Sequence, residues 1–404
     1  MAELDPTSWT CSSNEALYVS VAEPQGAFTF KPKFTYPIFG DAEQIFGYKD
    51  LRIDLAFDCK SLKPFLNYRY SSKISDDVKD INDQLLAFLP DSGKDAVLKS
   101  EEKWLDSVDD EKFEIPGECV GEYELNMDIK NTYKIYKFKP VESEEGLKLH
   151  RRMQIFVLLY IEAGSYIDEN DPIWDVYCIY KCPKDGSKET FVGFATTYAY
   201  WKYPGHEIYD SSEKQRYRKK ISQFIILPPF QGKHHGQHLY STIVSEWLKD
   251  DSVEEITVED PSEAFDDLRD RCDMERLLFE RGFLDSLDKL PVSEEWIEER
   301  RKVEKMEPRQ FDRCVEMGLF YLLKRGDSRI ENLNEKEIRL LVKKRLFRKN
   351  RDALVELEKA DMRDKLQTAY QRIRGDYERI LGRLRRGVKR SANEPGTTNE
   401  PRTK

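Results

Sequence analysis

One stretch of twenty residues decides the fold: Ile221-Ser-Gln-Phe-Ile-Ile-Leu-Pro-Pro-Phe-Gln-Gly-Lys-His-His-Gly-Gln-His-Leu-Tyr240. Its first part predicts a buried strand over residues 222–227, which Pro228 and Pro229 end. A short loop then opens a helix predicted over residues 235–249. A loop at a helix amino terminus presents backbone N–H groups and the positive end of the helix dipole, an arrangement that suits a pyrophosphate.

The loop matches neither common nucleotide-binding fingerprint, because the spacings G-x-x-x-x-G-K-S/T and G-x-G-x-x-G are both absent. It resembles the acetyl-CoA loop of the GNAT acetyltransferase superfamily, which reads Q/R-x-x-G-x-G/A. Gln231 and Gly236 match this pattern, whereas His234 replaces the middle glycine. A side chain at that position risks a clash with the pyrophosphate or forces a left-handed backbone.

Strands and helices alternate around this stretch, which indicates an α/β core over residues 121–285. The predicted strands cover residues 133–138, 174–180, 190–198, 222–227 and 255–258, and the predicted helices cover 147–167, 235–249 and 264–270.

The two flanking regions differ from this core. Residues 1–120 predict a β-rich domain, and residues 286–390 predict a helical region. The tail 391–404 lacks apolar anchors and is expected to be disordered. The fold class is therefore α+β with a mixed-sheet α/β core. The strands are expected at 28–36, 51–57 and 65–70, and the helices at 80–89, 294–305, 308–324, 335–349 and 351–386.

Longer blocks resemble the type B histone acetyltransferase family of the GNAT superfamily, over almost the whole chain and most of all its fungal catalytic subunits. These blocks are Trp9-Thr10, Ser13–Leu17, Phe34–Gly40, Ile45–Lys49, Arg151–Phe156, Ile221–Gln223, Thr257–Pro261 and Asp267–Asp270.

The resemblance implies an enzyme that uses acetyl-CoA as co-substrate and needs no metal. It implies acetylation of lysines on newly synthesised free core histones, chiefly the tail of histone four. It also implies a WD-repeat histone chaperone as partner, and a location in cytoplasm and nucleus.

The resemblance also assigns roles to residues. Glu259 corresponds to the general base, with Asp260 and Glu162 as neighbouring carboxylates. The strand Ile225, Ile226 and Leu227 would grip acetyl-CoA, and Ser262 would also contact it. The pyrophosphate would be held by Gly232, Lys233, His234, His235, Gly236, Gln237 and His238. The histone tail would be contacted by Asp41, Ala42 and Glu43, and the lysine channel would be lined by Tyr198, Tyr200 and Trp201.

The chemistry of acetyl transfer to a lysine requires such groups, independently of the resemblance. A lysine amine is protonated at neutral pH, so a base must remove a proton before the amine can attack a thioester. A carboxylate at the exposed end of a strand, beside a second acid, can act as that base. A backbone N–H group of the strand 225–227 can stabilise the oxyanion.

Each assignment has a simpler alternative. Glu259 and Asp260 can cap the helix that follows them, and Glu162 can be a structural hydrogen-bond partner in an apolar helix. The three clustered histidines mimic a metal site, but no acid or cysteine lies near them in the sequence. The aromatic run 198–203 can be ordinary core, and Asp41 and Glu43 can be solvated loop acids. The stripe 370–384 can be helix packing, and the basic segment 383–390 can be a nuclear import signal or a helix end.

Charge narrows the possible partners. The 404 residues carry a net charge of −10, which divides into −19 for residues 1–325 and +9 for residues 326–404. This balance argues against nucleic-acid binding by the catalytic body and favours a cationic partner there. It leaves open whether the basic segment contacts nucleic acid.

The cysteines and the apolar runs indicate in which kind of cellular compartment the protein is expected. Seven scattered cysteines without a C-x-x-C pair indicate reduced thiols. We expect neither a signal peptide nor a membrane span.

Two rival functions remain at this stage. One is a histone-binding scaffold that has lost turnover, because His234 interrupts the cofactor loop. The other is a GNAT enzyme that acts on other amines.

Overall fold

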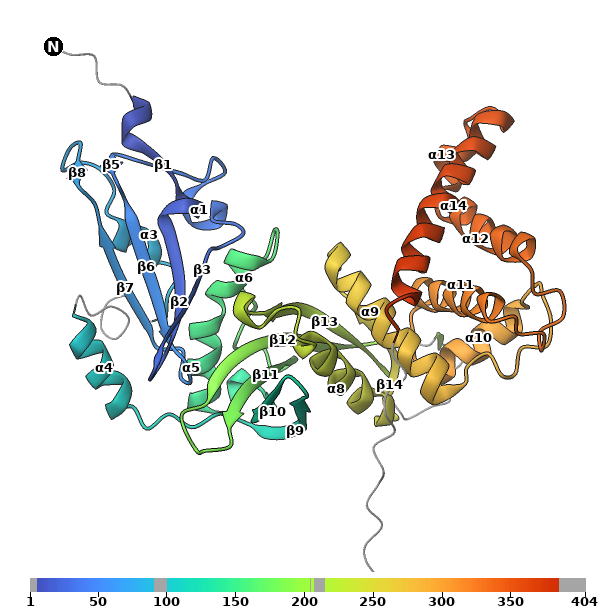
Figure 1. Ribbon diagram of the computed structural model, residues 1–404, viewed down its shortest axis with the longest axis horizontal. Coiled ribbons are helices and arrows are strands. Elements are labelled where there is room, and N and C mark those ends of the chain that lie inside the picture. Colours follow the sequence, from blue (N-terminus) through green and yellow to red (C-terminus); the bar gives the residue numbers. More distant parts are fainter. Residues whose placement is uncertain (1–5, 91–99, 204, 207–214, 385–404) are drawn as a thin grey trace, which may run out of the picture. The chain divides into compact units, whose positions relative to one another are not determined.

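The computed structural model describes residues 6–90, 100–203, 205–206 and 215–384, and the chain divides into two compact units between Pro261 and Ser262 (Figure 1). The predicted mixed α/β architecture is confirmed. The predicted boundaries at residues 120 and 285 remain predictions. The tail 391–404 and most of the basic segment 383–390 lie outside the described residues.

A sheet of four strands, in the order β3-β2-β6-β7, dominates the first part of the chain. Its two central strands are parallel, and every second residue of β2 is buried, which gives this face an apolar layer. The edge strand β3 stops short of the predicted residue 36, since Pro32 lacks the N–H group that a ladder needs. The bounds are β2 (Leu17–Glu23), β3 (Gly26–Phe30), β6 (Arg52–Asp58) and β7 (Pro64–Arg69).

A second sheet, in the order β14-β13-β12-β11-β10-β9, holds the predicted core strands. Its strands pair antiparallel except β13 and β14, which are parallel and are therefore joined by the crossover helix α8 (His235–Lys249), whose predicted bounds are confirmed. The bounds are β9 (Glu118–Leu125), β10 (Asp128–Phe138), β11 (Trp174–Pro183), β12 (Thr190–Trp201), β13 (Tyr217–Ile226) and β14 (Val253–Val258).

Helices α5 (Glu144–Met153) and α6 (Ile155–Tyr160) replace the single helix predicted over 147–167. The helix ends early because its carbonyl groups find other donors: Leu159 accepts from the N–H groups of Lys33 and Phe34 at 2.9 and 3.2 Å. The N–H group of Ala163, which would bond to Leu159 in a continued helix, donates to the Tyr36 hydroxyl. These bonds tie α6 to the first part of the chain.

Short elements complete the first unit. Asp80 caps α3 and Ser100 caps α4 by accepting backbone N–H bonds, as expected at helix starts. The bounds are η1 (Pro6–Trp9), β1 (Thr10–Ser12), α1 (Ser13–Ala16), α2 (Tyr36–Phe39), β4 (Gln44–Phe46), β5 (Tyr48–Lys49), β8 (Ser72–Lys73), α3 (Ile81–Leu86), α4 (Glu101–Asp110), η2 (Pro140–Glu142) and η3 (Pro228–Phe230).

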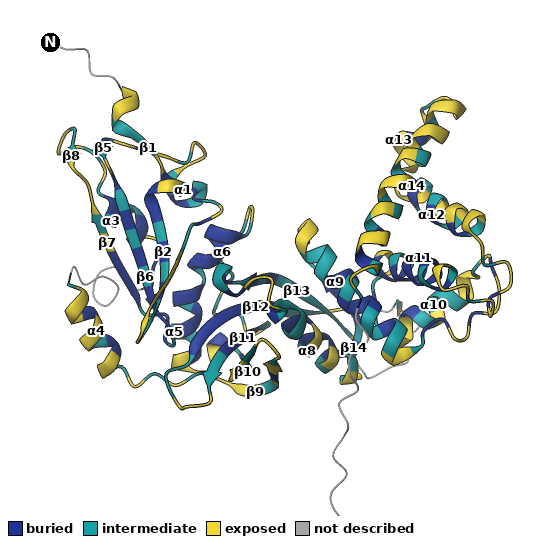
Figure 2. Ribbon diagram, in the orientation of Figure 1, coloured by how far each residue is buried: buried dark blue, intermediate teal, exposed yellow. Residues whose placement is uncertain are grey.

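The second unit is helical and has its own core around Phe283, Phe311 and Tyr377 (Figure 2). The helix predicted over 351–386 is divided, because Glu358 adopts an extended backbone and starts a new helix. Tyr370, Tyr377 and Ile380 are buried in this core, so the predicted stripe serves helix packing. The bounds are α9 (Glu263–Glu275), η4 (Arg276–Arg281), α10 (Glu294–Val303), α11 (Pro308–Lys324), α12 (Glu335–Lys349), α13 (Arg351–Val355) and α14 (Lys359–Leu381). No described helix is long and apolar enough to cross a membrane.

The first residue of α8 fixes that helix to the β9–β10 edge of the sheet. His235 is 1% exposed, and its Nδ1 atom lies 2.7 Å from the Tyr123 hydroxyl. Its ring also packs against Tyr133, with ring centres 4.6 Å apart. Burial, together with the nearby charges of His238 and Lys233, lowers the pKa of His235 to about 4.

We predict that His235 makes stability depend on acid. In the unfolded chain the imidazole binds a proton near its ordinary pKa of about 6.5, while the folded protein resists protonation until about pH 4. Stability is therefore complete above pH 6.5 and falls as the pH drops toward 4, by about 2 kcal/mol between pH 7 and 5. Urea unfolding at both pH values should show this loss in wild type and a smaller loss in His235→Gln. The exposed His206→Gln serves as control and should behave as wild type.

Candidate active site

The candidate site begins where β13 and β14 separate. Their parallel pairing ends at Ile221 and Val258, and the N–H group of Glu259 makes one more bond to the Ile221 carbonyl at 2.9 Å. Among the strands that the structure describes, residues 222–226 pair only with β12. One edge of this half of β13 is therefore unpaired by any strand and lies open beside the end of β14.

A β-bulge at Ser222 marks the point of separation. Thr196 pairs with Gln223 and Thr197 pairs with Ile221, which leaves Ser222 as an extra residue in β13. A bulge bends its strand and increases the local twist, so it turns the rest of β13 away from β14. The bulge also directs the Ser222 hydroxyl at Glu259, to which it donates a short hydrogen bond.

The loop after β13 brings main-chain groups to the start of α8. Gln231 closes the loop by donating from Nε2 to the Ile226 carbonyl at 2.7 Å. His234 has a left-handed backbone, with φ 70° and ψ 3°, so the strain that its side chain predicts is present. Gly232 also has a positive φ of 74°, and an added Cβ atom would meet only open space.

This loop fits a pyrophosphate. The first turn of α8 receives no side-chain cap from its N-cap residue His234, which leaves the positive end of the dipole for a ligand. Lys233 adds a cation beside it, held by a bond of 2.8 Å to the Pro229 carbonyl. The open space at Gly232 leaves room for an anion there.

The three loop histidines serve three different purposes. His234 Nδ1 lies 3.1 Å from Gln237 Oε1, and the His238 ring stacks on Tyr123 with centres 3.9 Å apart. His235 is buried against the sheet, as described above. No group of side chains able to hold a metal occurs in the described part of the chain.

Glu259 lies at the end of β14, opposite the bulge. Its carboxylate accepts from the Tyr198 hydroxyl at 3.2 Å and from the Ser222 hydroxyl, and Lys220 Nζ lies 3.9 Å away. The side chain is 40% exposed, so it is oriented by partners yet reachable by a substrate. Ser262, and not Glu259 or Asp260, caps α9 by accepting from the Phe265 N–H group, which removes the capping alternative.

Two tyrosines and a lysine line the same face of the sheet as Glu259. Lys220 Nζ lies 5.6 Å from the ring centres of both Tyr198 and Tyr200. Burial lowers the pKa of Lys220, but the Tyr198 hydroxyl and the Glu259 charge raise it above its ordinary value overall. Burial also raises the pKa of Tyr198, which keeps its hydroxyl a proton donor.

The three residues predicted to line the lysine channel therefore do not form one continuous surface. Tyr198 and Tyr200 are half-buried on one face, as alternate residues of β12. Trp201 occupies the other face of the strand, is 44% exposed and packs against Tyr203 with ring centres 5.4 Å apart. The structure therefore does not support the alternative that the aromatic residues of 198–203 are ordinary core.

The predicted substrate loop contains one residue with a structural task. Asp41 and Ala42 are exposed in a turn, whereas the Glu43 carboxylate accepts from the N–H group of Thr35 at 2.6 Å and from Asn14 Nδ2 at 2.8 Å. The Thr35 bond, ahead of the other bonds, holds the pKa of Glu43 below its usual range. Glu43 is therefore not a freely solvated acid: it ties the start of α2 to α1.

Glu162 is placed differently from the prediction. It is exposed in the turn after α6 and not in an apolar helix, because the bonds at Leu159 and Ala163 end that helix at Tyr160. The same turn is nevertheless connected to the site, since Gln223 Nε2 donates to the Ser165 carbonyl at 2.8 Å. Glu162 thus lies on a segment attached to the bulge, and its catalytic role remains a prediction.

Three residues with clear roles in this geometry were missed: Ser222, Lys220 and Tyr36. Ser222 lies inside the block Ile221–Gln223, but only the register shift shows that it is a bulge. Lys220 has no sequence pattern around it, and Tyr36 acts through a bond to Ala163 that joins distant segments. Ser262 begins the second unit, and its predicted cofactor contact remains a prediction.

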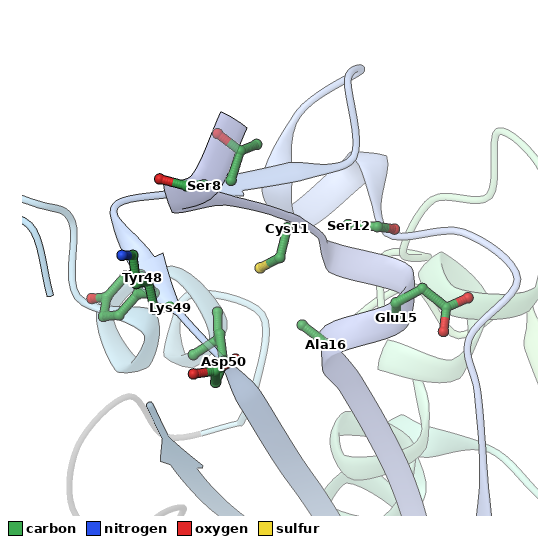
Figure 3. A pocket seen from close by; sticks show the side chains of 10 residues that line it. Ser8, Cys11, Ser12, Glu15, Ala16, Tyr48, Lys49 and Asp50 are labelled. Atoms are coloured by element: carbon green, nitrogen blue, oxygen red, sulfur yellow. The ribbon is translucent and has the colours of Figure 1, made fainter. Parts of the chain in front are cut away.

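A pocket of about 540 Å³ lies elsewhere in the first unit and contains none of the predicted site residues (Figure 3). Its wall mixes polar and apolar side chains and comes mainly from η1, β1, α1 and β5. The lining residues are Ser8, Thr10, Cys11, Ser12, Glu15, Ala16, Tyr48, Lys49, Asp50 and Leu51. The candidate active site is an open strand edge and not this pocket.

Comparison with known proteins gives a consistent result. Residues 9–162 match the family model described as Histone acetyl transferase HAT1 N-terminus, and residues 270–324 match the model described as Fungal HAT1, C-terminal. The histone acetyltransferase type B catalytic subunit of Candida albicans is 46% identical, with 98% of this chain and 95% of that protein covered. The protein of the same description from Debaryomyces hansenii is 48% identical, with 95% and 92% covered.

Relatives of the same description extend to Schizosaccharomyces pombe, at 36% identity with 93% of both chains covered. Such identity over nearly the whole length shows the family and its enzymatic activity. The chain belongs to the type B histone acetyltransferase catalytic subunits.

Proposed function

We propose that this histone acetyltransferase transfers the acetyl group of acetyl-CoA directly to lysines of newly synthesised free histones, chiefly in the tail of histone four, with Glu259 as general base. The observation that carries the proposal is the position of Glu259. Its carboxylate is oriented by Tyr198 and Ser222 at the point where β13 and β14 separate, beside an open strand edge.

The cofactor would bind along this open edge. The main chain of Ile225, Ile226 and Leu227 would line the cofactor there, through groups other than the Leu227 N–H, which donates to the Val192 carbonyl, and the Ile226 carbonyl, which accepts from Gln231. The loop from Gly232 to His238 would surround the pyrophosphate. The uncapped start of α8 and Lys233 support this placement. Ser222 and Glu259 would then lie at the end of β13 nearest the thioester.

The proton balance assigns a role to each side chain. Glu259 accepts a proton from the lysine ammonium, and the neutral amine attacks the thioester carbon. The C–S bond then breaks, the nitrogen loses its second proton to the departing coenzyme A thiolate, and Glu259 returns its proton to solvent. A backbone N–H group of the strand 225–227 stabilises the oxyanion. Tyr198 and Ser222 act as positioning residues, because both donate to the Glu259 carboxylate and fix its direction.

The aromatic face favours a lysine substrate. Lys220 Nζ lies 5.6 Å from the ring centres of both Tyr198 and Tyr200, which supports the view that this face can accommodate an ammonium group. The net charge of −19 over residues 1–325 would attract a basic histone tail and raise its association rate. A WD-repeat histone chaperone as partner, and a location in cytoplasm and nucleus, belong to the same proposal.

We predict that Glu259→Gln lowers kcat/KM for a histone-four tail peptide by about 10²–10⁴-fold, because the amide cannot accept the proton. Acetyl-CoA affinity, measured by calorimetry, should stay within about twofold since the loop at α8 is unchanged. Glu263→Gln removes an exposed acid nearby in sequence and is the matched control. Near-normal turnover of Glu259→Gln across the pH range would show that another group is the base.

The substrate class has its own test. A panel of lysine peptides with and without histone sequences should show turnover concentrated on the histone-four tail. Equal turnover on unrelated amines would favour the broader amine acetyltransferase. Histone binding without measurable acetyl-CoA binding would favour a scaffold instead.

We predict that His234→Gly stabilises the protein by about 1 kcal/mol, because glycine adopts the left-handed backbone without a Cβ clash. Acetyl-CoA affinity should be unchanged or higher, since the loop keeps its shape. His234→Ala is the matched control: it removes the imidazole but keeps the Cβ atom, so it should bring no such gain. Thermal unfolding and calorimetry measure both effects, and a lower melting temperature for His234→Gly would contradict the strain.

A further inference from the structure

Exposed cations gather in the second unit, where α11 begins and α12 ends. From Ile338 to its last residue α12 contains no acid, and Arg351 follows. Within the described residues, four exposed cations there form no ion pair; we name them the α11/α12 basic cluster. They are Arg309, Arg348, Lys349 and Arg351.

An ion pair between α11 and α12 fixes how these two helices lie against each other. Arg345 of α12 donates to both carboxylate oxygens of Glu316 on α11, at 2.8 and 2.9 Å. Residues 309, 313 and 316 share one face of α11, and residues 345 and 349 share one face of α12. Lys349 therefore faces the beginning of α11, where Arg309 lies.

Two acids near the cluster already have arginine partners. Arg313 is already paired with Asp270, and Arg345 with Glu316. The charge of Arg309, followed by burial and by the charges of Arg345 and Arg313, lowers the pKa of Lys349. Arg309 and Lys349 thus repel each other, whereas Arg348 and Arg309 also interact with the nearby carboxylates of Asp312 and Asp266.

Helix stability explains only part of this pattern. Cations in the last turn of a helix interact favourably with its dipole, which accounts for Arg348 and Lys349. Arg309 is the second residue of α11, where the dipole disfavours a cation. The repulsion between Arg309 and Lys349, neither of which forms an ion pair in the described part of the chain, points to a ligand that removes it.

We propose that the α11/α12 basic cluster binds the phosphate backbone of nucleic acid. Three of its four cations are arginines, whose planar guanidinium groups bind phosphate with two hydrogen bonds. The charge of +9 over residues 326–404 favours a long polyanion over a single anion. This surface lies outside the acetyl-transfer site and does not depend on the proposed function.

The test measures binding of the full chain to a 20-base-pair DNA duplex of arbitrary sequence by fluorescence anisotropy, between about 50 and 200 mM salt. The variant Arg309→Gln/Arg348→Gln/Lys349→Gln should lose at least tenfold in affinity at the low-salt end. The slope of log affinity against log salt should become less steep by about 3, since each phosphate contact contributes about 0.9. Its melting temperature should stay close to that of wild type, because the repulsion that is removed offsets the favourable dipole interaction that Arg348 and Lys349 lose.

The control Lys359→Gln/Arg363→Gln/Lys365→Gln removes the same charge from exposed positions of α14 and should change affinity less than twofold. An equal loss in the control, or no salt-dependent binding by wild type, would overturn the proposal. Competition by a polyglutamate peptide as effective as by DNA of equal charge would assign the cluster to an acidic protein instead. Histone acetylation should be equal in all three proteins.

Discussion

The site depends on one constraint, the point at which β13 and β14 stop pairing. Parallel strands joined by a crossover helix continue side by side as long as both keep their registers. Here the bulge at Ser222 ends the common register directly after the Ile221–Val258 pair. One strand edge is opened and the end of β14 is left beside it, so a main-chain binding edge and a carboxylate become neighbours.

Packing around this point keeps the geometry fixed. His235 anchors α8 to Tyr123 and Tyr133, which places the helix start after the open edge. On the other side, Gln223 holds the turn after α6 through Ser165. Tyr36 connects that turn to the loop that Glu43 closes. The predicted substrate loop and the predicted base thus belong to one hydrogen-bonded framework.

Charge is distributed to match two different tasks. In the first unit, the acid at the site is held by hydroxyl donors and a lysine and stays reachable. In the second unit, buried acids such as Glu316 neutralise arginines between helices, while four exposed cations at the helix ends form no ion pair among the described residues. Paired charges there support the core, and the unpaired ones form a surface.

The sequence by itself determined the type and order of most elements, since hydrophobic periodicity and prolines are local signals. The bounds of α8, α11 and α12 were predicted without error, and the motif blocks identified the family. Only the tertiary structure decided the positions of Glu162 and Glu43, because contacts from distant segments end α6 and occupy the Glu43 carboxylate. It also decided that His234 accepts a left-handed backbone and that Ser222 is a bulge, since strand register depends on partners that lie far away in the chain.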